Sequence, residues 1–200
     1  MNILNIAAGK LKPLYNNKYT VPYFIVNLDT SYFSGNTPAE VEMGYSHWIE
    51  NRNRTSVEWF CKHDAFEFME RTTLEFERVC MYRFLEHVPF DKVSYFIYLI
   101  STVTKPGAIV DVIVPDYEKL ARMILGEDPL DPAFGNFEAH NIQLTTELLN
   151  EPSCPHASIW TEKRAQYFWT LEDRFVIKDV EKDFDFDGRD IYLRFQAVRK

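Results

Sequence analysis

The chain has 200 residues, of which 46% are hydrophobic, and its 30 acidic and 22 basic side chains give a net charge of −8 at pH 7. This composition excludes an intrinsically disordered protein, and the length predicts a single domain over residues 1–200. The acidic balance argues against a nucleic-acid partner, because broad phosphate binding relies on clustered lysine and arginine.

Predicted strands and helices alternate along the sequence. Short apolar runs predict strands over 3–7, 23–28, 57–61, 79–81, 109–114, 175–180 and 191–198. Apolar residues on a helical spacing predict helices over 66–69, 91–103, 117–124, 142–149 and 161–171, and a further helix over 38–49. Lys105-Pro-Gly107 is predicted to end a helix in a loop, because proline lacks a backbone donor and glycine permits the turn. The acidic segment 182–190 is predicted to be the turn region of a final hairpin.

This order of elements indicates a fold class. A strand, a crossover helix and a second strand of these lengths form a parallel pair, which needs helices on its faces. The alternation therefore predicts an α/β sandwich. Sheets of this kind bind ligands at the carboxyl ends of their strands. Acidic and glycine residues gather at those ends here, which predicts a nucleotide-like ligand at that edge.

Three motifs carry a resemblance to a known family. They are Leu85-Glu-His-Val88, Lys105-Pro-Gly107 and Pro115-Asp-Tyr-Glu-Lys-Leu-Ala-Arg122. In these motifs the chain resembles class I S-adenosylmethionine-dependent methyltransferases, in particular the methyltransferase type 11-like group. The resemblance implies a Rossmann-like, three-layer α/β sandwich with a seven-stranded, mostly parallel sheet and a C-terminal antiparallel hairpin. It also implies S-adenosyl-L-methionine as the cofactor and S-adenosyl-L-homocysteine as the product.

The resemblance implies that the loop after the first strand approaches the methionyl part of the cofactor. That loop usually reads Leu-Asn-Leu-Gly-Cys-Gly in the family, whereas Ala7, Ala8, Gly9 and Lys10 stand here. Because Ala7 replaces the first glycine, the cofactor has less clearance. A tight turn that follows any strand is the alternative interpretation of a loop with one glycine.

Two acidic residues are predicted to bind the adenosine part of the cofactor. Asp29, next to Thr30, follows the second strand, where a carboxylate can accept both ribose hydroxyls. The resemblance implies that Asp64 accepts from the adenine amino group while the backbone amide of Ala65 meets a ring nitrogen. Asp64 could instead only cap the following helix, and one carboxylate can serve both roles.

The resemblance places Arg83, Phe84 and His87 against the methionine end of the cofactor. His87 is a candidate catalytic residue, because a neutral imidazole near the methyl group could accept a proton from a hydroxyl or amine. His156 is a second candidate, because the family often has a histidine, an aromatic residue and a capping threonine before the sixth helix. A helix-start residue and a surface residue are the alternatives for His87 and His156.

The sequence predicts no catalytic metal. Magnesium-dependent relatives carry Glu-x-x-Glu-His at the turn after the fourth strand. Glu86 and His87 match this pattern, but Arg83 stands in the position of the first glutamate. A cation would meet a guanidinium there, and Arg83 could pair with Glu86 instead.

The substrate side is expected beyond the fifth strand, in the loop after it and the segment before the later helix. Beside His156, the candidates there are Pro115, Asp116, Tyr117, His140 and Trp160. The aromatic side chains of Phe134, Phe137 and Trp160 could form an apolar lid or belong to the core. In-line methyl transfer depends mainly on positioning and desolvation, so a general base is needed only if the acceptor arrives protonated.

These features favour an enzyme that methylates an O or N atom of a small molecule, such as a sugar or other metabolite. The alternative is a scaffold protein that binds S-adenosyl-L-methionine with weak or no turnover. A nucleic-acid methyltransferase is disfavoured because no Asn/Asp-Pro-Pro-Tyr/Phe signature follows the fourth strand. A nicotinamide-dependent dehydrogenase is disfavoured because the Gly-x-Gly-x-x-Gly loop is absent from the sequence.

The sequence also predicts a cytoplasmic setting without a membrane partner. The first residues lack the basic region, apolar core and cleavage site of a secretory signal. No apolar run approaches the roughly 20 residues of a membrane helix. Cys61, Cys80 and Cys154 are odd in number and far apart, so neither a disulfide framework nor a Cys-x-x-Cys metal site is predicted. The oligomeric state stays open.

Overall fold

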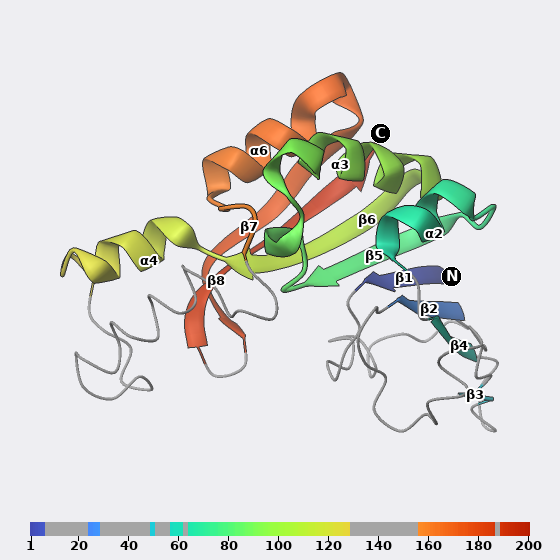
Figure 1. Cartoon of the computed structure of the whole chain (residues 1–200), viewed down its shortest axis with the longest axis horizontal. Helices are drawn as coiled ribbons and strands as arrows, with labels where there is room; N and C mark the ends of the chain where they lie inside the picture. Colours follow the sequence, from blue (N-terminus) through green and yellow to red (C-terminus); the bar gives the residue numbers. More distant parts are fainter. Residues whose placement is uncertain (7–23, 29–48, 51–56, 62–63, 129–155, 187–188) are drawn as a thin grey trace.

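An eight-stranded sheet in the order β3-β4-β2-β1-β5-β6-β8-β7 is the centre of the fold (Figure 1). The computed structural model describes residues 1–6, 24–28, 49–50, 57–61, 64–128, 156–186 and 189–200. The strands are β1 Asn2–Ile6, β2 Phe24–Leu28, β3 Ile49–Glu50, β4 Val57–Cys61, β5 Phe76–Tyr82, β6 Thr104–Pro115, β7 Phe175–Phe186 and β8 Arg189–Arg199. The helices are α2 Ala65–Arg71, α3 Val93–Val103, α4 Tyr117–Ile124 and α6 Glu162–Thr170, with short 3-10 turns η1 Leu85–His87, η2 Phe90–Lys92 and η4 Leu171–Asp173.

The sheet is mostly parallel, as predicted. Strands β4, β2, β1, β5 and β6 run in the same direction, whereas β8 is antiparallel to β6 and β7 is antiparallel to β8. The carboxyl ends of the five parallel strands therefore share one edge. Within the described residues the sheet has one strand more than predicted, because Ile49 and Glu50 pair antiparallel with β4. Ile49 thus lies in a strand, and the remainder of the helix predicted over 38–49 lies outside the described residues, as does the one predicted over 142–149.

The helices cover both faces of the sheet, because the strands alternate their side chains between two cores. Helices α2, α3 and α6 cover one face of the sheet, as Figure 1 shows. Leu4, Val79 and Val112 belong to the core on that face. Ile3 and Ile113 point to the opposite face, where α4 packs with its side chains at Tyr117, Leu120 and Met123. This arrangement confirms the predicted α/β sandwich. Among the described residues, none of the helices combines the length and hydrophobicity that crossing a bilayer requires.

The helices begin where the sequence predicted, because a polar side chain caps each of three helices. The side chains of Asp64, Asp116 and Thr161 accept hydrogen bonds from backbone amides in the first turns of α2, α4 and α6. Lys119 anchors α4 a second time. Its buried Nζ lies 2.8 Å from Asp183 Oδ1, 3.0 Å from Asp190 Oδ2 and 2.7 Å from the Asp190 carbonyl oxygen, which ties the helix to the β7–β8 hairpin.

The predicted loop at Lys105-Pro-Gly107 is wrong, because β6 begins at Thr104, directly after α3. The pairing is irregular there: β5 advances from Phe76 to Arg78 while β6 advances from Thr104 to Ile109. Gly107 has a φ of 82°, which glycine adopts without strain. The motif therefore ends the helix as predicted, but it forms a bulge inside the strand rather than a loop.

The final hairpin is longer than predicted. The segment predicted as a turn region over 182–190 contains the end of β7 and the start of β8, and Phe186 is buried against Tyr82 and Tyr192. Asp179 and Asp183 have positive φ values of 51° and 54°, and the pairing register shifts near both. Aspartate tolerates this conformation, so the acidic residues mark bulges within a strand and not the end of one.

Candidate active site

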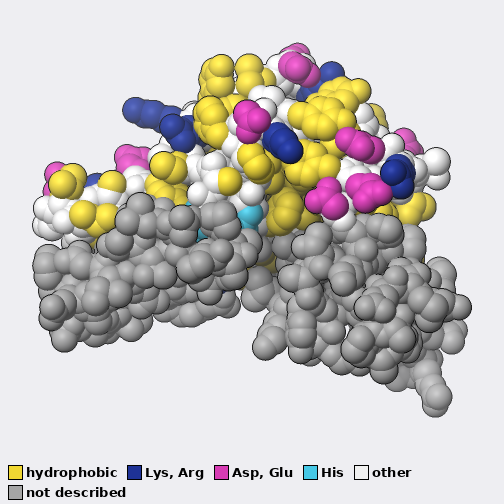
Figure 2. All heavy atoms as spheres, viewed as in Figure 1, with side chains coloured by type: hydrophobic (Ala, Val, Ile, Leu, Met, Phe, Trp, Pro, Cys, Tyr) yellow, Lys and Arg dark blue, Asp and Glu magenta, His cyan; other side chains and the backbone are white. Residues whose placement is uncertain are grey.

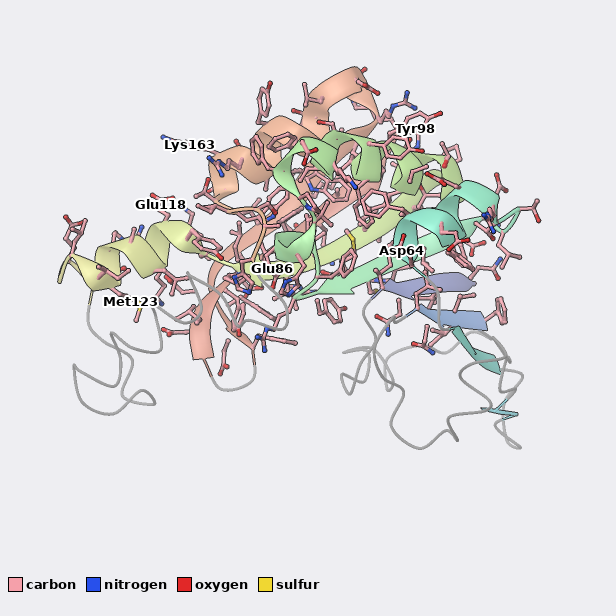
Figure 3. All side chains as sticks on the ribbon, in the orientation of Figure 1. Asp64, Glu86, Tyr98, Glu118, Met123 and Lys163 are labelled. Atoms are coloured by element: carbon pink, nitrogen blue, oxygen red, sulfur yellow. The ribbon has the colours of Figure 1, made fainter. Side chains whose placement is uncertain are left out.

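The chain turns sharply at the carboxyl end of β5, the edge at which the sequence predicted a ligand. Arg83 directly follows the strand with a φ of 56°, and its backbone N–H donates to the Ile113 carbonyl oxygen at 2.8 Å. This conformation is uncommon for a residue with a side chain. The turn directs Phe84 and the 3-10 turn η1 across the end of the sheet, and Figure 3 shows Glu86 there.

A distant segment, residues 156–160, is held against η1 by hydrogen bonds. The backbone N–H groups of Ala157 and Ser158 donate to the Glu86 carbonyl oxygen at 2.8 and 2.9 Å. The Ser158 hydroxyl donates to the Leu85 carbonyl oxygen at 3.0 Å. The indole Nε1 of buried Trp160 donates to Ser158 Oγ at 2.9 Å and to the Leu85 carbonyl oxygen at 3.3 Å. We call this set of bonds the clamp.

The clamp brings the two predicted catalytic histidines together. The rings of His87 and His156 lie with centroids 4.9 Å apart and an interplanar angle of 70°. The Tyr117 hydroxyl lies 2.5 Å from His156 Nδ1. Both histidines are half-buried. Histidine side chains accordingly reach the surface near the middle of the molecule in Figure 2.

Glu86 completes the cluster. Its side chain is fully buried. One ligand atom from each of Glu86, His87 and His156 lies within 4.8 Å of the others. The sequence pattern identified the Glu86-His87 pair, but it contained no signal that His156 would join it. The geometry could hold a metal ion or position two imidazoles against a bound molecule.

A second polar pair lies further along the same sheet, and sequence reasoning missed it. Asn5 and Asn27 face each other across β1 and β2, and the Asn5 amide donates to Asn27 Oδ1 at 2.9 Å. Both side chains are buried. A buried side-chain hydrogen bond of this kind fixes the register of the two strands, whose carboxyl ends lead into the predicted cofactor loops. The only available signal was an asparagine within each apolar run.

Comparison with known proteins identifies the fold. No protein-family model matches the sequence, and no curated protein matches it either. Among solved structures, a SAM-dependent methyltransferase from Methanosarcina mazei is similar with a TM-score of 0.53 at 18% identity, covering 99% of this chain and 92% of that one. An N1-methyltransferase of 1,6-didemethyltoxoflavin from Burkholderia thailandensis, solved with that compound and S-adenosylhomocysteine, has a TM-score of 0.59 at 11% identity, with 100% and 71% covered. An N-methyltransferase from Bradyrhizobium japonicum in complex with S-adenosylhomocysteine has a TM-score of 0.53 at 11% identity, with 99% and 77% covered.

The chain has the class I SAM-dependent methyltransferase fold. The resemblance that the three sequence motifs carried is confirmed at the level of fold. Several of the predicted cofactor contacts, namely Ala7, Ala8, Gly9, Lys10, Asp29 and Thr30, lie outside the described residues, as do His140, Phe134 and Phe137. Strands β1 and β2 end at Ile6 and Leu28, immediately before the first two of these groups.

Asp64 caps α2 in this methyltransferase fold, which was one of its two predicted roles. Its Oδ1 accepts from the backbone N–H groups of Phe66 and Glu67 at 2.9 and 3.1 Å. The cap uses Oδ1 alone, and the residue is exposed, so Oδ2 stays available to a ligand. Ala65 is buried directly behind it. Figure 3 shows Asp64 at the start of α2.

On the expected substrate side, the structure shows the positions of Trp160 and Asp116, and both are buried. Trp160 belongs to the core, where it is 1% exposed, and does not form a lid. Asp116 is also buried, and its Oδ1 accepts from the backbone N–H groups of Glu118 and Lys119. Its Oδ2 has no hydrogen-bond partner among the described residues. Burial therefore raises the pKa of the Asp116 carboxyl, although the two amides act in the opposite direction.

Asp116→Asn is expected to change how stability depends on pH. With the pKa of Asp116 raised by folding, the folded protein keeps this proton at a pH where the unfolded chain has lost it. Ionisation of Asp116 thus lowers stability as the pH rises above the ordinary aspartate range of about 4. Asparagine preserves the helix cap but cannot ionise. Urea unfolding should show the wild type losing stability relative to the variant as the pH rises above about 4. A difference that stays constant over this range would contradict the assignment.

Proposed function

We propose that the protein transfers a methyl group from S-adenosyl-L-methionine to an O or N atom of a small molecule. The observation that carries this proposal is the meeting of His87 and His156 at the carboxyl end of β5 in a class I methyltransferase fold. Ligands of open α/β sheets bind at that edge. One of the similar structures was solved with the small acceptor 1,6-didemethyltoxoflavin and S-adenosylhomocysteine bound, which supports a small acceptor.

The described residues fit the cofactor at one contact that can be tested. The unused Oδ2 of Asp64 can accept the adenine amino group while Oδ1 holds the helix cap. Asp29 and Thr30 are proposed to bind the ribose, and the segment Ala7–Lys10, with Arg83 and Phe84, to enclose the methionyl part. When bound, the cofactor supplies a sulfonium methyl group that a lone pair of the acceptor displaces.

The remaining residues position the acceptor and handle its proton. The rings of His87 and His156 contact each other, and Tyr117 fixes the orientation of the His156 ring. The clamp holds together the two backbone segments that carry these rings and does not use their side-chain nitrogens. We propose that these rings line the acceptor subsite, where an imidazole can take the proton that an attacking hydroxyl or protonated amine releases.

Ligand-dependent melting tests occupancy first. Both S-adenosyl-L-methionine and S-adenosyl-L-homocysteine are expected to raise the melting temperature, because each binds only the folded protein. No shift with either compound at millimolar concentration would contradict the proposal. A panel of hydroxyl- and amine-bearing metabolites then tests turnover by release of S-adenosyl-L-homocysteine. Firm binding without transfer to any acceptor would favour the scaffold alternative.

Asp64→Ser separates the adenine contact from the helix cap. Serine caps helices as well as aspartate does but has no second oxygen acceptor. The variant is expected to keep the unliganded melting temperature and to bind S-adenosyl-L-homocysteine about tenfold more weakly, as the loss of one hydrogen bond implies. Calorimetric titration measures the change. Equal affinity in the variant and the wild type would exclude Asp64 from the cofactor site.

A further inference from the structure

We infer that Glu86, His87 and His156 together bind one divalent transition-metal ion. Each of these residues offers a ligand atom within 4.8 Å of the other two. A metal with bonds of about 2.1 Å places its ligand atoms some 3–3.5 Å apart. The side chains must therefore close on the ion, and we propose that the half-buried His87 side chain moves most, because Tyr117 holds the ring of His156.

The backbone around the cluster is already fixed. The Glu86 carbonyl oxygen accepts from the N–H groups of Ala157 and Ser158, so the segment that carries His156 is bonded directly to the residue that carries the carboxylate. The three ligands come from two segments far apart in sequence, and these bonds remove most of the conformational freedom between them. Metal sites gain affinity when their ligands are held in this way before the ion arrives.

Tyr117 provides the outer contact that metal-binding histidines usually have. Its hydroxyl lies 2.5 Å from His156 Nδ1. When Nδ1–H donates to the Tyr117 oxygen, the lone pair of the ring is on Nε2, which is then the atom that faces the ion. Such a bond fixes both the tautomer and the orientation of the ring.

Charge also favours a cation in this position. The Glu86 side chain is fully buried, and placing a carboxylate in a protein interior costs several kcal/mol unless positive charge or hydrogen bonds compensate. A divalent ion bound between this carboxylate and two neutral imidazoles would place positive charge directly beside the carboxylate. The donor set also indicates the class of ion, because imidazole suits zinc, iron and similar metals, whereas magnesium prefers oxygen ligands.

A metal ion at this cluster is contrary to the prediction of no metal from the sequence, although the observation about Arg83 behind that prediction still holds. Arg83 in the position of a glutamate argues against a magnesium site built from several carboxylates. The structure supplies His156 as a different third ligand, which changes the site from oxygen-rich to nitrogen-rich. With an ion bound, His87 and His156 act as ligands, so the proton-accepting role proposed above belongs to the protein without an ion. The inference concerns ion binding alone, so it does not depend on methyl transfer.

Calorimetric titration of the EDTA-treated full chain with Zn²⁺, Co²⁺ and Mg²⁺ tests the inference. The expected result is one Zn²⁺ or Co²⁺ per chain, a raised melting temperature, and binding of Mg²⁺ at least about 100-fold weaker. Bound Co²⁺ should also show visible absorption that reports its nitrogen and oxygen ligands. The absence of stoichiometric Zn²⁺ and Co²⁺ binding to the wild type would overturn the inference.

Four variants assign the ion to this cluster. Glu86→Gln and His156→Asn are expected to abolish stoichiometric binding, and Tyr117→Phe to weaken it about 10-fold or more. Glu67→Gln removes an exposed carboxylate on α2 and should bind as the wild type does. Circular dichroism confirms folding of each variant. Undiminished binding in folded Glu86→Gln and His156→Asn would show that the ion lies elsewhere and would overturn the inference.

Discussion

Asp111→Ala is expected to lower the free energy of unfolding by about 3–5 kcal/mol, because it leaves two guanidinium groups without their shared carboxylate. Asp111 is 2% exposed in the middle of β6. Arg194 from β8 binds it in a bidentate manner, with Nε 3.2 Å from Oδ1 and Nη2 3.2 Å from Oδ2. Arg78 from β5 places Nη2 3.2 Å from the same Oδ2, and the Tyr82 hydroxyl donates to it at 3.4 Å.

Urea unfolding measures this effect, and two further variants interpret it. Asp111→Asn keeps an acceptor without the charge and should lose less stability than the alanine variant. Arg78→Met/Asp111→Leu/Arg194→Met removes all three charges and should approach wild-type stability, because apolar groups of similar size can replace a buried ionic cluster. A loss below about 1 kcal/mol in Asp111→Ala would mean that water reaches the arginines and that the cluster contributes little.

Trp160→Ala is expected to cost about 3–5 kcal/mol and to disconnect the two halves of the site. The indole is buried in the core beside Phe168, and its Nε1 donates to both Ser158 Oγ and the Leu85 carbonyl oxygen. Truncation leaves a large cavity and removes the side chain that joins the segment 156–160 to η1. The ring of His156 should then lose its fixed position beside His87.

Trp160→Phe is the matched control for that variant. It fills most of the cavity but removes the Nε1–H donor, so its cost should be only about 1–2 kcal/mol. The Leu85 carbonyl oxygen keeps the Ser158 hydroxyl as a donor. Urea unfolding compares the stabilities, and imidazole resonances in NMR spectra report the histidine environments. Equal losses in the two variants would show that the hydrogen bonds, and not the packed ring, carry the effect.

The sequence predicted the elements whose signals are local. The apolar runs of β1, β2, β4 and β8 lie where expected, and α2, α4 and α6 begin within one residue of their predicted starts. The failures concern boundaries that pairing decides. Thr104 begins a strand immediately after α3 because Phe76 in β5 is its partner, and β7 continues through an acidic stretch because β8 pairs with it. Propensity at Lys105-Pro-Gly107 and Asp183 could not reveal partners that lie elsewhere in the chain.

In the candidate site, too, the sequence revealed local features but not the contacts between distant segments. The turn after β5 was recognisable because Glu86 and His87 are adjacent in a familiar motif. The contact between His87 and His156 depends on a backbone hydrogen bond between Glu86 and Ala157. Any residue type except proline can donate such a bond, so the amino-acid sequence does not reveal it. The burial of the Glu86 carboxylate was equally hidden, because a glutamate in a 3-10 turn is usually solvated. The predicted roles of Asp29, Gly9 and their neighbours stay predictions.

The anchoring of Lys119 determines how α4 can open. A helix of 8 residues is too short to persist by itself in water, so α4 exists only while it is packed. Because the Lys119 ammonium contacts oxygens of both Asp183 and Asp190, the helix cannot separate from the sheet without also releasing the turn end of the β7–β8 hairpin. Helix and hairpin then form one cooperative opening unit, whose amide hydrogens exchange with solvent together.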